Sequence, residues 1–135
     1  MSFSKSRFSN KYQYELTRYS SKLGYRIIGG AGKLLKYFEK NYNPKSLISY
    51  ADRRWSTGKM YESLGFVFQS NSFPNYWYFK SNDLTKLESR IKYQKHKLKN
   101  ILVNFDTNKT EIQNMIANGF NAIYDCGNKV YIKEY

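Results

Sequence analysis

The chain has 135 residues, the length of one ordinary domain, and 23 Lys and Arg against ten Asp and Glu give a formal net charge of +13. Such an excess favours polyanionic partners, and nucleic acid is the main polyanion inside a cell. No apolar run reaches the roughly 18 residues of a membrane span. The single cysteine, Cys126, excludes an internal disulfide framework and favours a reducing, cytoplasmic compartment. With one histidine, His96, no two-histidine metal site is possible, and we expect no metal.

The N-terminal segment, residues 1–11, is rich in Ser, Asn and Lys. This composition predicts a flexible basic arm, in which Lys5, Arg7 and Lys11 contact the phosphates of nucleic acid. A simple disordered terminus is the alternative.

Residues 12–80 alternate strand and helix patterns. Tyr and Leu recur at every second position over 12–19, which predicts a strand. A helix is expected over about 31–42, stopped by Asn43-Pro44, and short strands and a short helix follow. Alternating strands and helices of this kind predict an α/β fold.

Three glycines lie within four positions just before the first predicted helix. Glycines allow close backbone approach to an anion, and the free N–H groups at a helix start favour negative charge. The phosphate- or cofactor-binding candidates are Gly29, Gly30, Ala31, Gly32 and Lys33. A tight turn that packs the helix on a strand is the alternative interpretation.

The segment YADRRW, residues 50–55, follows a predicted buried strand, at the end where α/β proteins gather their sites. Asp52 and Tyr50 are the catalytic candidates, Asp52 as a general base or as a partner of Arg53 or Arg54. A carboxylate neutralised by its neighbouring arginines is the favoured alternative. Arg53 and Arg54 are also nucleic-acid-binding candidates.

Residues 81–135 are expected to add a basic helix over about 84–102, a second helix from Thr110, and a β-hairpin over 120–133. We expect this extension to pack with the 12–80 core as one domain. Its nucleic-acid-binding candidates are Arg90, Lys92, Lys95 and Lys99, on the surface of the first helix.

Four segments together resemble the non-catalytic C-terminal region of phage homing endonucleases that carry a Vsr-like nuclease domain. They are IIGGAGKLLKYF, SYADRRWSTGKMYESLGF, PNYWYF and TEIQNMIANGFNAIYDCGN. This resemblance implies DNA targeting without implying cleavage, in the cytoplasm of the phage's host, with a nuclease as a further partner. A third class of function is a phage accessory or anti-defence protein that binds a host nucleoprotein complex.

Residues 12–80 also resemble the acyl-CoA-binding half of the GNAT acetyltransferase fold, and are similar to Mom-type phage proteins that modify DNA adenine. The resemblance implies a GNAT-like mixed sheet flanked by helices. It maps a cofactor pyrophosphate onto residues 29–32, with acetyl-CoA as the cofactor, and places Tyr50 and Asp52 near the acceptor. The strands that precede this core in a full GNAT domain are missing. We therefore expect a DNA-binding protein without a cofactor, with an acyltransferase as the alternative.

Overall fold

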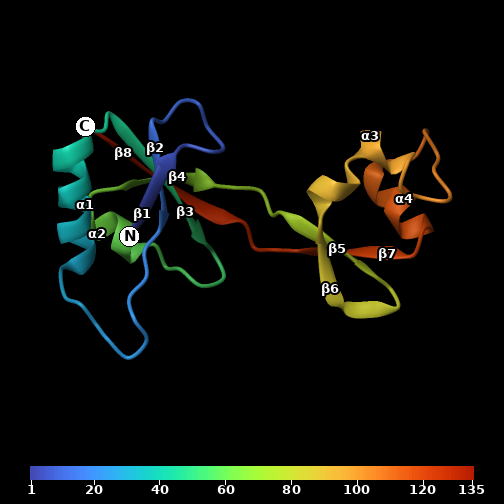
Figure 1. Cartoon of the computed structure of the whole chain (residues 1–135), viewed down its shortest axis with the longest axis horizontal. Coiled ribbons are helices and arrows are strands. Elements are labelled where there is room, and N and C mark those ends of the chain that lie inside the picture. The colour runs from blue at the N-terminus through green and yellow to red at the C-terminus, as the bar shows by residue number, and fades with distance from the viewer. The chain divides into compact units, whose positions relative to one another are not determined.

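The computed structural model describes all residues, 1–135, and divides them into two compact units. Unit 1 comprises Met1–Phe73 and Gly127–Tyr135, and unit 2 comprises Pro74–Cys126. Each unit combines a β-sheet with helices (Figure 1), which confirms the α/β class. The predicted boundary after residue 80 does not coincide with these units, because the last strand of the chain belongs to the sheet of unit 1.

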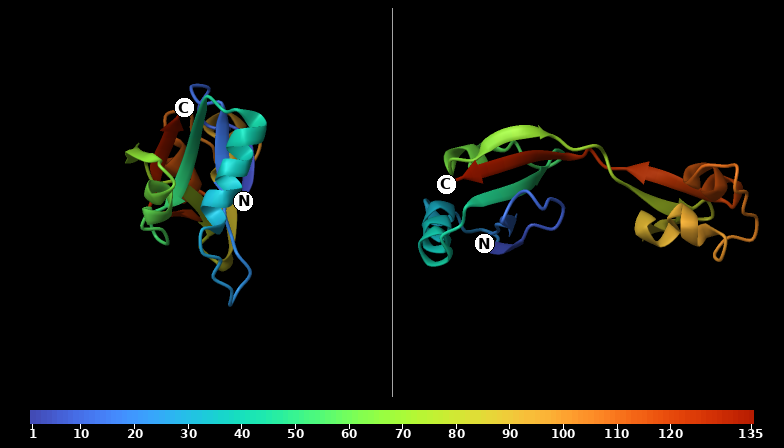
Figure 2. Two further views of the ribbon diagram at one scale, coloured as in Figure 1. Left: turned by 90° about the vertical axis from the view of Figure 1, so that its left-hand side faces the viewer. Right: turned by 90° about the horizontal axis from the view of Figure 1, so that it is seen from above.

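Unit 1 contains a five-stranded mixed sheet in the order β1-β2-β3-β8-β4. Its strands are β1 (Ser2–Lys5), β2 (Tyr14–Arg18), β3 (Ser46–Asp52), β4 (Val67–Asn71) and β8 (Asn128–Glu134). β2 and β3 are parallel, and the other neighbours are antiparallel. Helix α1 (Gly30–Tyr42) connects β2 to β3, so it begins at the sheet edge where these two strands end (Figure 2).

The core of unit 1 lies between the sheet and its two helices, α1 and α2 (Lys59–Ser63). Leu35 and Phe38 of α1 pack on Leu47 of β3 and Tyr131 of β8. The opposite face of the sheet carries a smaller cluster of Tyr12, Ile48 and Val130. Here the loop between β1 and β2, rather than a helix, covers the sheet.

The predicted flexible arm, residues 1–11, was wrong, because its first residues form strand β1. Phe3 lies opposite Leu16 of β2, and its ring stacks on that of Phe38 with 3.8 Å between ring centroids. Met1 packs against the same core, and these apolar side chains hold the otherwise polar segment on the sheet.

Unit 2 contains a three-stranded antiparallel sheet in the order β6-β5-β7. Its elements are β5 (Tyr76–Lys80), β6 (Asp83–Ser89), the 3₁₀ helix η1 (Arg90–Tyr93), α3 (Lys95–Leu98), α4 (Glu111–Ala117) and β7 (Phe120–Tyr124). Tyr78, Leu98 and Met115 are fully buried together between the sheet and these helices.

Two predictions for the C-terminal part were wrong. Residues 84–102 form a strand, a 3₁₀ turn and one short α-helix in place of a single long helix. Leu84 and Leu87, whose spacing suits the apolar face of such a helix, are exposed in the strand that forms instead. The expected hairpin over 120–133 is also absent, because β7 pairs with β5 whereas β8 pairs with β3 and β4.

Candidate nucleic-acid interface

The glycine-rich loop begins helix α1 as the sequence predicted. Gly29 is the N-cap residue, with φ of 70°, and it has no side chain to cap the helix. Its carbonyl accepts the N–H of Lys33 at 3.0 Å, which starts the helical ladder. The left-handed conformation explains the glycine at position 29, whereas Gly30 and Gly32 lie inside the helix.

A cavity of about 620 Å³ lies over this loop. Its lining includes the loop glycines, Arg26, Lys59 of α2 and Ile27. The first N–H groups of a helix have no intrahelical acceptor, and two cations beside them add to the positive potential. The geometry therefore suits an anion with an apolar portion. Lys33, predicted as part of this site, does not line the cavity.

The turn after β3 positions the YADRRW residues. Asp52 accepts the backbone N–H of Arg54 at 2.8 Å, and its second carboxylate oxygen lies 4.0 Å from the Arg54 guanidinium. The backbone N–H of Arg53 donates to the carbonyl of Gly127 at 3.1 Å. Asp52 thus accepts a hydrogen bond within the turn and lies near the guanidinium of Arg54. Its catalytic role stays a prediction.

Arg54 also lies over the ring of Trp55, with 4.8 Å between the guanidinium carbon and the ring centroid. Trp55 is 77% exposed. An exposed indole beside a guanidinium offers both a stacking surface and a phosphate contact. Sequence reasoning found the arginines of this turn but did not single out Trp55.

The loop between β1 and β2 carries a second pair of this kind. The Arg7 guanidinium lies 5.2 Å from the ring centroid of Phe8, which is 74% exposed and meets Tyr50 edge to face. Arg7 also pairs with the buried carboxylate of Glu15, and this hydrogen bond raises the pKa of Arg7. Burial and the charge of Glu15 raise the pKa of Tyr50, so its hydroxyl stays protonated near neutral pH.

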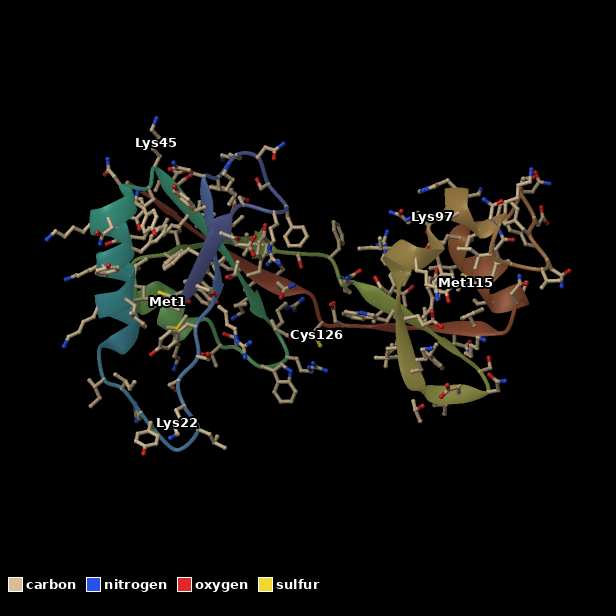
Figure 3. The ribbon with its side chains drawn as sticks, in the orientation of Figure 1. Met1, Lys22, Lys45, Lys97, Met115 and Cys126 are labelled. Atoms are coloured by element: carbon tan, nitrogen blue, oxygen red, sulfur yellow. The ribbon has the colours of Figure 1, made fainter.

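Two more candidates flank this loop. Lys5 lies in β1 opposite Tyr14, and the ammonium of Lys11 lies 5.4 Å from the ring centroid of Tyr12. Figure 3 labels Lys22, in the loop that leads to Gly29, and Lys45, just before β3. Neither was predicted as a site residue, because single lysines in loops give no local pattern.

The four candidates from 90–99 do not share one helix face. Arg90 lies over the ring of Tyr76 at 4.7 Å, and Lys92 pairs with Glu88 at 2.6 Å. The ammonium of Lys95 donates to the carbonyl of Thr107 at 3.1 Å. Lys99 is the C-cap residue of α3. They are four separate basic positions of unit 2, because the expected helix over 84–102 is absent.

Comparisons with protein-family models, with curated proteins and with solved structures found no match. The resemblances to phage homing endonucleases and to the GNAT fold therefore stay predictions. No three His, Cys, Asp or Glu side chains come together as metal ligands. None of the helices combines the length and the hydrophobicity that crossing a bilayer demands.

Proposed function

We propose that this chain binds nucleic acid, with duplex DNA as the principal ligand, mainly through phosphate contacts. The observation that carries the proposal is the charge of unit 1, which has 15 Lys and Arg against five acids. Its acids are too few to neutralise these cations, so most of the positive charge remains available to a polyanion. Solubility alone needs a net charge of only about 2 to 8 on a small domain.

The exposed pairs Arg54–Trp55 and Arg7–Phe8 support the same proposal. In each pair a guanidinium lies beside an exposed aromatic ring, which suits a base or a sugar. The guanidinium of Arg54 also suits phosphate oxygens, whereas that of Arg7 is paired with Glu15. A surface that served only solubility would not need the rings.

The test is the salt dependence of binding to duplex DNA, measured by fluorescence anisotropy. About six phosphate contacts give a log–log slope near −5. Arg54→Gln should make the slope shallower by about one unit. Lys109→Gln is the matched control, because Lys109 is an exposed cation 3.9 Å from Asp106. A slope between about 0 and −1 would overturn the proposal.

A GNAT-type acyltransferase acting on nucleic acid or protein is the second candidate function. The cavity over the glycine loop favours it, because that cavity opens where parallel β2 and β3 end, the edge at which α/β proteins bind ligands. In this function acetyl-CoA is the cofactor, and Tyr50 and Asp52 lie near the acceptor. Calorimetric titration with acetyl-CoA separates the two functions, because micromolar affinity would favour the transferase.

The proposed lineage is a phage protein of the host cytoplasm, related to the targeting region of homing endonucleases and without a nuclease centre. The alternative is a phage accessory or anti-defence protein that binds a host nucleoprotein complex through the same basic surface. Co-purification from infected cells, with and without nuclease digestion, distinguishes direct nucleic-acid binding from binding to a protein in such a complex.

A further inference from the structure

Unit 2 contains a cleft of about 740 Å³ that no sequence motif predicted. Its walls come from the turn between β5 and β6, from β6 itself, from η1, from the segment after α3 and from the start of β7. The volume lies within the range of about 300 to 1,000 Å³ that is typical of small-molecule sites. It is larger than a lone phosphate group needs.

Three lysines line one side of the cleft. Lys92 is paired with Glu88 at 2.6 Å, and Tyr93 donates its hydroxyl proton to the same carboxylate oxygen at 2.6 Å. These two hydrogen bonds lower the pKa of Glu88, which keeps it ionised at neutral pH. Lys80 and Lys86 form no ion pair within 4.0 Å, although the charge of both lowers the pKa of Asp83 and that of Lys86 contributes to the lowered pKa of Glu88. Both lysines line the cleft, so they are the cations that an anionic ligand would meet there.

The other side of the cleft is apolar and open to solvent. Val103 is 95% exposed and Ile101 is 43% exposed, although both are branched hydrocarbon side chains. Burying them against a flat ligand would be favourable. The cleft therefore combines unpaired cations with an apolar wall across a nucleotide-sized space.

We propose that this cleft binds a nucleotide, with the phosphate on Lys80 and Lys86 and the base against Ile101 and Val103. The nucleotide comes either as a free monophosphate or as an unstacked nucleotide of a strand, and the two share this chemistry. If the ligand is an unstacked nucleotide of a strand, the cleft rests on the proposed function and is part of the nucleic-acid-binding surface. If the ligand is a free monophosphate, the cleft is independent of that function.

The test is calorimetric titration of the full chain with thymidine monophosphate, thymidine and inorganic phosphate. The monophosphate should bind at least about tenfold more tightly than either fragment, because only it contacts both walls. Lys86→Gln should weaken its binding about tenfold, the loss of one charge-assisted hydrogen bond. Val103→Glu, at an exposed position, should weaken binding strongly because a carboxylate replaces the apolar surface on which the base packs, and it should leave the fold unaffected.

Lys109→Gln is the matched control, because it removes the same charge from unit 2 outside the cleft. Equal losses in Lys109→Gln and Lys86→Gln, or monophosphate binding unaffected by Val103→Glu, would overturn the proposal. Repeating the titrations with a single-stranded oligothymidylate shows whether the cleft binds a nucleotide of a strand or a free monophosphate. If it binds a strand nucleotide, Val103→Glu should weaken the affinity for the oligothymidylate as well. If Lys86→Gln and Val103→Glu still bind duplex DNA, the proposed function is unaffected by the cleft. If the protein binds the monophosphate but not duplex DNA, the proposed function is refuted and the cleft proposal is not.

Discussion

Replacing Arg7 by Ala should destabilise unit 1 far more than the loss of an exposed charge would. The Glu15 side chain is only 2% exposed, and Arg7 supplies its nearest cation at 2.5 Å. Nε and the backbone N–H of Arg7 also donate to this carboxylate, at 3.2 and 3.3 Å. Arg7→Ala keeps the backbone donor but leaves a buried charge without its counterion.

Removing one partner of a buried ion pair costs about 3–5 kcal/mol. The Arg7 side chain is 57% exposed, so water replaces part of the lost interaction, and we expect about 2 kcal/mol. For a unit of this size that loss lowers Tm by about 8–16 °C. Thermal unfolding followed by circular dichroism at neutral pH measures it.

Lys11→Ala is the control, because it removes one charge from the same loop, and it should change stability by no more than about 0.5 kcal/mol. Arg7→Ala combined with Glu15→Gln should recover part of the loss, since a neutral amide is less costly to bury than a carboxylate. Equal Tm values for the Arg7 and Lys11 variants would refute the reasoning, and Arg7 would then be free to act as a phosphate contact alone.

Two further predictions concern the helix α1. Gly29→Ala should cost about 1–2 kcal/mol because φ at this position is 70°, whereas Gly32→Ala, inside the helix, should be neutral or stabilising; chemical denaturation compares them. Burial alone would raise the pKa of Glu39, but hydrogen bonds from Lys133 and Tyr135 outweigh it and lower that pKa. The stabilisation by ionised Glu39 is therefore fully present above the ordinary pKa of about 4.3 and is lost as pH falls through the lowered pKa. The difference in unfolding free energy between the original protein and Glu39→Gln should vanish in acid.

Local patterns predicted the parts of the fold that local chemistry determines. The helix expected over 31–42 is observed as Gly30–Tyr42, because its apolar periodicity and Asn43-Pro44 both act within the segment. Thr110 likewise caps α4, with reciprocal hydrogen bonds to Gln113. The glycine loop and the turn at Asp52 were predictable for the same reason.

Predictions from local patterns were wrong where strands pair with segments that are distant in sequence. The period of Leu84, Leu87 and Ile91 suited a helix, but β5 needs a second strand beside it and residues 83–89 supply it. β7 and β8 resemble two arms of a hairpin, yet each pairs with strands distant in sequence. The lysine cleft was unpredictable for this reason, because its cations meet only after the β5–β6 pairing forms.

The position of unit 2 in the chain leads to the last prediction. β4 and β8 are antiparallel neighbours, and just beyond them the N–H of Ser72 donates to the carbonyl of Asn128 at 2.8 Å. Unit 2 thus occupies the place of a hairpin turn, and the core clusters of unit 1 contain no residue from it. Replacing residues 74–126 by an Asn-Gly turn should therefore leave unit 1 folded, with a cooperative melt.

That shortened chain also separates the two proposed ligand sites. It keeps 15 cations against five acids, so duplex binding and most of its salt slope should remain, whereas thymidine monophosphate binding should be lost with the cleft. A folded protein without DNA affinity would move the DNA-binding surface to unit 2. If the shortened chain does not fold, unit 2 stabilises unit 1 through contacts outside the core clusters of unit 1. We expect the shortened chain to keep its duplex binding, because phosphate contacts depend on the positive charge of unit 1 and not on the continuity of the chain.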